Sequence, residues 1–154
     1  MTAIRRLRPT DGPALLSMYE RCSRGTRYAR WLSPASTFPE PYLRSLLACT
    51  SEHLAVVAVC DREPRCVIGL ASAAAISEGC RELGFLVEDR YQAQGVGRLM
   101  LDALAELLDS SEDLYAFALS DNRWVFDKLA HLGTLAIHHE YGLSDVRVLR
   151  GSAV

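Results

Sequence analysis

Residues 81–100 read RELGFLVEDRYQAQGVGRLM, and three kinds of local structure follow one another in this stretch. Residues 82–87 have the apolar character of a strand, and an amphipathic helix is predicted at 97–108 because its apolar residues recur at helical spacing. The turn between them holds Gly95 and Gly97, which let the backbone approach a ligand closely. The stretch therefore predicts a strand, a glycine turn and a helix in immediate succession.

This turn predicts an anion site. The first turn of a helix carries N–H groups without partners and a partial positive charge, so the amides of residues 92–97 are placed to bind phosphate. Arg98, just inside the helix, would add a charge-assisted hydrogen bond. A turn that serves packing alone stays an alternative. A dinucleotide site needs a third small residue where Met100 stands, and a P-loop needs a Gly-Lys-Ser/Thr sequence that does not follow.

The flanking sequence predicts one α/β (α+β) domain over residues 1–154, with a mixed sheet and helices on both faces. Strands are predicted at residues 4–8, 54–60, 66–73, 82–87, 114–119, 135–140 and 146–149. Helices are predicted at residues 14–22, 41–49, 97–108 and 122–132. Residues 23–41 are rich in Ser, Arg, Gly and Pro, and we interpret them as a loop with short helical turns. In the helix at 97–108, the stripe expected to face the core is Leu99, Met100, Ala103, Leu104 and Leu107.

The composition argues against several classes of function. With a formal net charge of -2 and no apolar run of membrane-spanning length, the 154-residue chain is not expected to bind nucleic acid or a membrane. Five irregularly spaced cysteines and four histidines predict reduced thiols in a cytoplasmic protein rather than a metal site. Residues 1–6 lack the apolar core of a signal peptide. A local site for a small phosphorylated molecule is compatible with this composition.

The glycine turn is similar to the acyl-CoA signature of the GNAT superfamily of N-acetyltransferases, Gln/Arg-x-x-Gly-x-Gly/Ala, which Gln92, Gly95 and Gly97 match. Later in the chain Asn122 is followed eleven residues on by Gly133, as is typical of that family. The resemblance implies the GNAT fold, a mixed and mostly antiparallel sheet of six to seven strands, splayed at strands 4 and 5 and flanked by about four helices. It also implies acetyl-CoA as the cosubstrate and no metal.

In that family the strand before the turn pairs through its backbone with the pantetheine arm of CoA, as a sheet edge pairs with an added strand. The turn would hold the pyrophosphate, and Asn122 and Phe126 would border the pantetheine and the thiol end. The cosubstrate-binding residues that the resemblance implies are Phe85, Leu86, Val87, Gln92, Ala93, Gln94, Gly95, Val96, Gly97, Arg98, Asn122 and Phe126.

Acyl transfer to an amine also needs a base. A lysine amine with a pKa of ~10.4 is almost wholly protonated at pH 7, a penalty of roughly 4–5 kcal/mol that a base, a proton wire or a desolvating pocket must offset. Glu82 is the candidate, because it shares a strand face with Gly84 and Leu86 beside the expected groove. A backbone N–H near Leu86 or Val87 would stabilise the developing oxyanion. A solvated charge stays the alternative for Glu82, and residues 88–90 are interpreted as a solvated turn.

One position departs from the family pattern. Many members carry a Tyr seven residues after the Asn, where it protonates the leaving thiolate, but Leu129 stands seven residues after Asn122. The remaining proton donors are Ser120, Tyr91 or water, or the thiolate leaves unassisted. The absent Tyr keeps a second function open, that of a catalytically weak acyl-CoA-binding regulatory module of the same fold.

A narrower resemblance concerns the acceptor. Residues 5–11, 23–31 and 82–87 are similar to the acetyltransferase domain of bacterial protein-lysine acetyltransferases, where a Glu at the matching strand position is the base and an apolar residue often replaces the Tyr. This resemblance favours Glu82 and a lysine-like amine. The expected partners are acetyl-CoA and an amine substrate, either a small molecule or a protein lysine. Dimers are common in this superfamily, so a homodimer is a further expectation by analogy.

Overall fold

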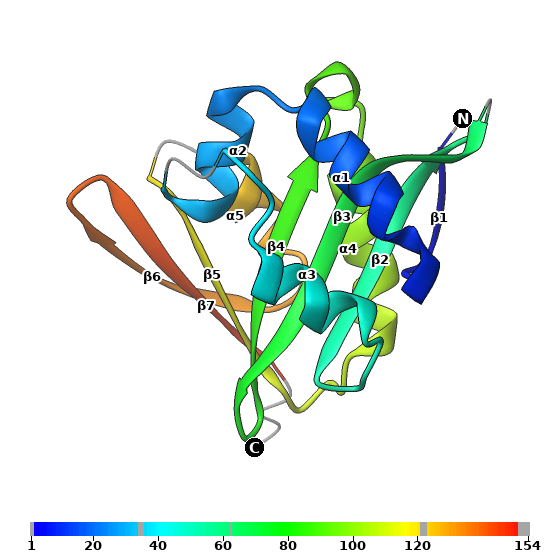
Figure 1. Cartoon of the computed structure of the whole chain (residues 1–154). Helices are drawn as coiled ribbons and strands as arrows, with labels where there is room; N and C mark the ends of the chain where they lie inside the picture. The colour runs from blue at the N-terminus through cyan, green and yellow to red at the C-terminus, as the bar shows by residue number, and fades with distance from the viewer. Residues whose placement is uncertain (1, 34–35, 62, 121–122, 151–154) are drawn as a thin grey trace.

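A computed structural model describes residues 2–33, 36–61, 63–120 and 123–150 of the chain (Figure 1). Within these ranges the strands are β1 (Thr2–Arg6), β2 (His53–Cys60), β3 (Glu63–Ser77), β4 (Cys80–Val87), β5 (Asp113–Leu119), β6 (Thr134–Glu140) and β7 (Leu143–Leu149). The helices are α1 (Gly12–Arg21), α2 (Arg24–Trp31), α3 (Glu40–Leu47), α4 (Val96–Leu107) and α5 (Arg123–Leu129). Short 3-10 turns lie at Pro9–Asp11 (η1) and Asp89–Tyr91 (η2).

The strands form one mixed sheet in the order β1-β2-β3-β4-β5-β7-β6. Neighbouring strands run antiparallel except β4 and β5, which pair in parallel from Cys80 to Glu82. Beyond Glu82 the two strands diverge, and β4 continues to Val87 with β5 turned away from it (Figure 1). The predicted sheet, mixed, mostly antiparallel and splayed at strands 4 and 5, is therefore confirmed.

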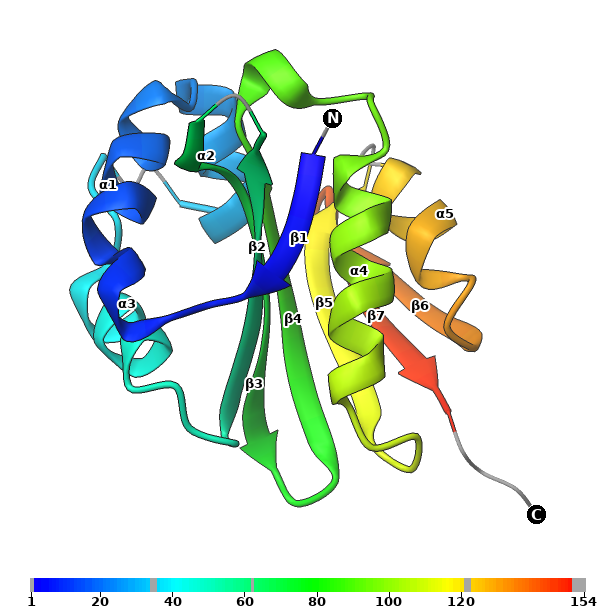
Figure 2. The same cartoon turned by 90° about the vertical axis from the view of Figure 1, so that its right-hand side faces the viewer.

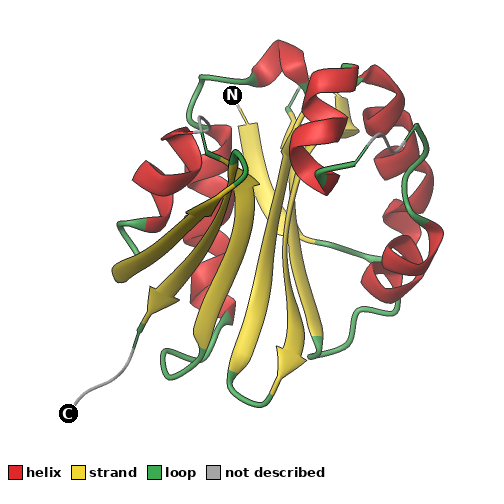
Figure 3. Cartoon of the chain, turned by 90° about the vertical axis from the view of Figure 1, so that its left-hand side faces the viewer, coloured by secondary structure: helices red, strands yellow, loops and turns green. Residues whose placement is uncertain are grey.

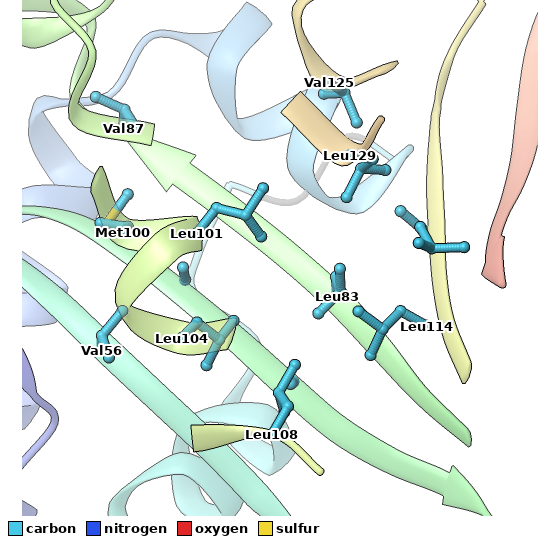
Figure 4. Close-up of a cluster of buried hydrophobic side chains, with 14 of the residues drawn as sticks. Val56, Leu83, Val87, Met100, Leu101, Leu104, Leu108, Leu114, Val125 and Leu129 are labelled. Atoms are coloured by element: carbon cyan, nitrogen blue, oxygen red, sulfur yellow. The ribbon is translucent and has the colours of Figure 1, made fainter. Parts of the chain in front are cut away.

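Helices cover both faces of the sheet, as predicted. The helices α1, α2 and α3 lie on one face, and α4 and α5 lie on the other (Figures 2 and 3). Each face has its own hydrophobic core. The core under α4 and α5 contains the fully buried Leu101, Leu104 and Leu114 (Figure 4), and the core on the opposite face contains Leu15 and Met18. Apolar burial on both faces explains why β2 reads as a continuous apolar run rather than an alternating one.

The buried face of α4 is rotated relative to the predicted stripe. Met100, Leu101 and Leu104 are fully buried, whereas Leu99, which was expected in the core, is 48% exposed. The helix is apolar on more than one side, so its sequence fits more than one rotational phase. The N-cap of the helix is Gly95, in a left-handed conformation with φ of 84°.

Residues 23–41, predicted as a loop with short helical turns, contain the eight-residue helix α2, which is more regular structure than predicted. Ser23 is its N-cap, and the Ser23 hydroxyl accepts a hydrogen bond from the Thr26 N–H at 3.1 Å. Leu32 ends the helix in a left-handed conformation with φ of 55°. None of the residues of α2 is buried, and the segment is rich in arginine, so it lacks the stripe of core residues by which a helix is usually recognised. None of the helices in the described part of the chain has the length and hydropathy needed to span a bilayer.

The strand β3 is longer than predicted and ends in a tight hairpin to β4. Ser77 pairs with Cys80, and Gly79 in the turn between them has a φ of 74°. The predicted strand ended earlier because small residues such as alanine have weak strand propensity. The hairpin register places Gly84 of β4 directly opposite Ser72 of β3.

Candidate active site

The gap between β4 and β5 exposes a strip of backbone on β4. Successive residues of a strand direct their N–H and C=O groups to opposite sides. The Glu88 N–H donates to Ile68 O on β3 at 2.9 Å, so Leu86 also directs its backbone groups to β3. Phe85 and Val87 consequently direct their backbone groups into the gap. Of the three strand residues predicted to bind CoA, Phe85 and Val87 thus direct their backbone groups toward the space where an added strand or a pantetheine arm would pair, and Leu86 does not.

The loop after β4 presents a row of backbone amides. Within the described residues, the amides of positions 93–98 donate to no carbonyl, and no side chain caps the start of α4. Ala93 and Gly95 have left-handed φ values of 61° and 84°, and such residues turn successive N–H groups toward one concave side. The amide of Gln92 differs from the rest of the predicted set because it donates to Asp89 O at 3.2 Å. The amides from 93 onward form a concave row at a helix N-terminus, an arrangement that in proteins generally suits an anion.

The side chain of Gln92 fixes this loop in place. Its Nε2 donates to Val87 O at 2.9 Å and to Thr26 Oγ1 at 3.0 Å. An amide nitrogen has two hydrogens, so both are used by these bonds. The side chain therefore links the end of β4, the loop and helix α2.

Asp89 joins the same loop to the start of α2. Its carboxylate accepts hydrogen bonds from the Ser23 N–H at 2.8 Å, the Ser23 hydroxyl at 2.7 Å and the Thr26 hydroxyl at 3.0 Å. Burial raises the pKa of Asp89, but these hydrogen bonds outweigh burial and the net pKa is lowered. The neighbouring Glu88 is buried and lies 3.1 Å from Arg21 Nε. The interpretation of this segment as a solvated turn is therefore wrong for the buried Glu88, whereas Asp89 is exposed and also hydrogen-bonded to α2.

These elements enclose a cleft of about 770 Å³, a size typical of small-molecule sites. The cleft runs between α2 on one side and β5 with α5 on the other, and β4 forms its floor. Its lining includes, from the loop, Tyr91, Gln92, Ala93, Gly95, Val96 and Gly97, and from β5, Ala116, Phe117, Ala118 and Leu119. The amide concavity and the exposed strand edge thus open into one continuous space.

Glu82 lies where β4 and β5 part, opposite Tyr115 of β5. Its side chain is half-buried and lines the cleft on the strand face shared with Gly84 and Leu86, as predicted. Within the described ranges its carboxylate has no hydrogen-bond or ion-pair partner. A carboxylate in this state can accept a proton directly or through one water molecule.

A model of the acetyltransferase (GNAT) family matches residues 19–125, which include the turn, the exposed strand edge and Glu82. The chain belongs to the acetyltransferase (GNAT) family. No curated protein matches it in a sequence search.

Solved structures of GNAT proteins share the fold. The GNAT domain of S. lividans PAT superposes with a TM-score of 0.79 at 19% identity, covering 95% of this chain and 89% of that chain. The putative acetyltransferase yncA from Salmonella typhimurium, solved with its cofactor acetyl-CoA, has a TM-score of 0.75 at 17% identity, covering 99% and 96%. A GNAT phosphinothricin acetyltransferase from Sinorhizobium meliloti, in complex with AcCoA, has a TM-score of 0.72 at 16% identity, covering 99% and 91%.

Two polar residues of the GNAT signature region lie outside the cleft lining among the described residues. Arg98 runs along the surface of α4, where its Nε is 3.4 Å from Asp102. Gln94 folds back within the loop and donates its Nε2 to Arg90 O at 3.1 Å. Their backbone amides belong to the same row of unpartnered N–H groups.

The later GNAT positions on α5 are only partly described. Asn122 lies outside the described residues. Phe126 packs against the core, with its ring centroid 6.3 Å from that of His139. The residues of α5 that line the cleft are instead Val125 and Lys128. On a short helix the residues at i and i+3 share a face, and here that face is the one turned to the cleft.

The GNAT Tyr position is filled by a buried leucine. Leu129 is 0% exposed and belongs to the core under α4 and α5. Among the alternative proton donors, Ser120 is hydrogen-bonded to Ser144 Oγ at 2.8 Å, and Tyr91 lies at the amide end of the cleft. Burial raises the pKa of Tyr91, which keeps its hydroxyl protonated. Lys128, the only lysine in the sequence, lines the cleft one residue before Leu129.

The resemblance at residues 23–31 implied a segment beside the acceptor groove but did not single out Arg30, which lines the cleft from α2 and lies against Gly84 of β4. A signal for it was present, since a glycine inside a strand often marks a place where another group approaches closely. The partner of that glycine is a residue 54 positions earlier (84 − 30), and no local pattern identifies it.

Proposed function

We propose that this chain transfers an acetyl group from acetyl-CoA to a primary amine, with Glu82 as the general base. The observation that carries the proposal is the open gap between β4 and β5, which joins the backbone groups of Val87 to the amides of residues 93–97. A pantetheine arm has amide groups that pair with a strand edge, and a pyrophosphate suits a row of unpartnered N–H groups. When bound, acetyl-CoA would supply the activated acyl group as a thioester.

In this proposal the side chains of the protein remove a proton from the acceptor amine. An alkylammonium with a pKa of ~10.4 must lose a proton before it can attack, which costs roughly 4–5 kcal/mol at pH 7. Glu82 lies in the cleft with its lone pairs available, so it would accept that proton directly or through water. The Val87 N–H points into the gap and is the better candidate to stabilise negative charge on the carbonyl oxygen, because the Leu86 N–H faces β3.

Further features of the proposal come from the sequence. The acceptor proposed from the narrower resemblance is a lysine-like amine, on a protein or on a small molecule. All five cysteines lie within the described residues and are free thiols, which supports a cytoplasmic protein. A homodimer and a single domain over residues 1–154 stay predictions.

The test compares Glu82→Gln with a matched control, Glu78→Gln, which changes an exposed carboxylate in the β3–β4 turn. Free thiol release from acetyl-CoA is measured against a panel of amines, peptides and protein lysates. Glu82→Gln should lower kcat by about a hundredfold. It should leave the Kd for acetyl-CoA unchanged, and the control should match the wild type in both. Equal turnover by the wild type and Glu82→Gln removes Glu82 as the base.

The buried Leu129 favours a second candidate function. A chain without a proton donor at this position would bind acetyl-CoA as a regulatory module with little turnover. Ligand at 100 times its Kd should raise the stability of either kind of protein by ~2.7 kcal/mol, so a thermal shift with acetyl-CoA tests for the site itself. Thiol release above the uncatalysed rate with any acceptor then shows that the chain is an enzyme and not a regulatory module.

A further inference from the structure

Arg30 is placed in the cleft by contacts with three elements. A Cβ added at Gly84 would lie 2.5 Å from Arg30 Cζ and 2.8 Å from its Nε, so a larger residue there would displace the guanidinium. Arg30 Cζ lies 4.0 Å from the ring centroid of Trp31 and 4.9 Å from that of Tyr42. The hydroxyl of Tyr42 is in turn hydrogen-bonded to Ser72 Oγ. The two rings contact each other edge-on, with centroids 5.0 Å apart, and the guanidinium is therefore held against β4 beside this aromatic pair.

This packing leaves the hydrogen-bonding capacity of Arg30 unused by the protein. A ring contact of this kind is with the charge of the guanidinium and uses none of its five N–H donors, which lie in its plane. Within the described residues no acceptor atom or carboxylate partners Arg30, although its side chain is half-buried and lines the cleft. A planar fork of donors at the wall of a cleft suits bidentate binding of a carboxylate.

The proposed base lies one step along the same strand face. Glu82 and Gly84 are alternate residues of β4, so their side-chain positions are about 7 Å apart. This spacing separates the carboxylate from the guanidinium of Arg30, and no ion pair between them is found among the described contacts. The cleft therefore presents a negative and a positive group side by side, each available to a ligand.

We infer that the acceptor carries a carboxylate close to its reacting amine, and that Arg30 binds this carboxylate while the amine faces Glu82. The inference rests on the proposed function, which makes Glu82 the base. It narrows the acceptor to amino-acid-like molecules or to an amine beside an acidic side chain. Arg30 is then a specificity-determining residue, and Gly84 is small because the guanidinium occupies the space above it.

The phosphates of CoA have a separate site. The amide concavity begins after Val87, which is three residues and about 10 Å along β4 from Gly84. Thr26 contacts Gln92 at that end, and Arg30 lies one turn further along α2. The carboxylate that Arg30 would bind thus lies away from the loop amides that would bind the phosphates of CoA.

The test is a calorimetric titration of the protein saturated with CoA, a complex that cannot transfer an acetyl group. The ligands are matched pairs, a panel of amino acids and the amines that lack only the carboxylate. A second arm uses lysine peptides with and without a neighbouring glutamate. The wild type should bind the carboxylate-bearing member of a pair about a hundredfold more tightly. Arg30→Met should abolish this preference, whereas Arg24→Met, at an exposed arginine of the same helix, should retain it.

Gly84→Ala provides a second variant, because its methyl group displaces the guanidinium without removing its charge, and it should also lose the preference. All variants should keep the wild-type Kd for acetyl-CoA, which shows that they are folded. A preference seen with free amino acids assigns a small-molecule acceptor, and one seen only with the peptides assigns a protein acceptor. No carboxylate preference in the wild type, an equal loss for both members of a pair in Arg30→Met, or an equal loss of acetyl-CoA affinity overturns the inference.

Turnover measured on the same ligands separates this inference from the proposed function. If binding depends on Arg30 but no thiol is released from acetyl-CoA, the carboxylate site is supported and the proposed acetyltransferase activity is refuted. If amines without a carboxylate are acetylated as fast as their carboxylated partners, the acetyltransferase activity is supported and the carboxylate site is refuted.

Discussion

Two substitutions at Gly95 separate the effect of backbone strain on stability from the effect of an added charge on acetyl-CoA binding. Its φ of 84° is left-handed, and a Cβ added there meets no atom within 4 Å. Gly95→Ala therefore adds strain without a clash, about 1–2 kcal/mol for an L-residue in this conformation. For a domain of this size the loss corresponds to a fall in Tm of roughly 2–8 °C. The amides keep their positions, so we expect the Kd for acetyl-CoA to stay close to the wild-type value.

Gly95→Asp adds a carboxylate to the same backbone. Aspartate tolerates left-handed φ better than alanine and is favoured at a helix N-terminus, so this variant should be at least as stable as Gly95→Ala. Its carboxylate lies where the pyrophosphate is expected. Two like charges about 5 Å apart repel by roughly 3 kcal/mol at an effective dielectric constant of 20, before screening by solvent. We expect a net loss of about 2–3 kcal/mol, which is a 30- to 150-fold rise in Kd.

The assay is isothermal titration of acetyl-CoA into both variants at low salt, with Tm measured in parallel. Stability and affinity should separate, with the aspartate variant the more stable and the weaker in binding. Added salt should narrow the difference in Kd because it screens the exposed charge. Equal Kd values for the two variants at low salt would show that phosphates do not bind at these amides.

Three further outcomes are expected. Burial and then the charges of Arg30 and Arg81 lower the pKa of His53 to about 4, so the unfolded state takes up a proton first as the pH falls. The free energy of unfolding should then drop by roughly 2–3 kcal/mol between pH 6.5 and 4, and urea titrations of His53→Gln should lack this component. Burial raises the pKa of Cys22 to about 11, so iodoacetamide at pH 8 should modify it at least a hundredfold more slowly than the exposed Cys49, as peptide mass spectrometry will show. Gln92→Ala should destabilise the protein by about 1–2 kcal/mol and speed hydrogen exchange in α2, because the bond to Thr26 is lost.

The row of unpartnered amides could be predicted because its geometry is local. A left-handed Gly95 directly before a helix leaves the first amides of that helix without partners, whatever surrounds the turn. The orientation of Phe85 and Val87 also follows from strand alternation once the pairing with β3 is known. Sequence alone named three consecutive strand residues, since it does not reveal which side of β4 is paired.

Helix α2 was not predicted with the same rules, because none of its residues is buried and its sequence has no stripe of core residues. The residue that fixes its start is Asp89, which lies 66 residues after Ser23 and accepts hydrogen bonds from its N–H and hydroxyl. Ser23 followed by Thr26 was a recognisable N-cap signal, but the run of arginines after it resembled a solvated loop. The sequence also did not show which face of helix α5 is turned to the cleft. A helix that spans only Arg123–Leu129 has too few residues for its periodicity to choose between Phe126 and Lys128 as the side facing the cleft.

The same loop that presents the amides also positions the helix that carries Arg30. Asp89 and Gln92 both bind Thr26, so the N-terminal turn of α2 is fixed to the end of β4 where the amides begin. One turn of helix advances about 5.4 Å, which brings Arg30 alongside the middle of β4, where only a glycine leaves room for a guanidinium. An arrangement of the loop that moved the amides would therefore move the guanidinium as well. The row of amides and the guanidinium of Arg30 therefore depend on the same contacts, those that join Asp89 and Gln92 to the first turn of α2.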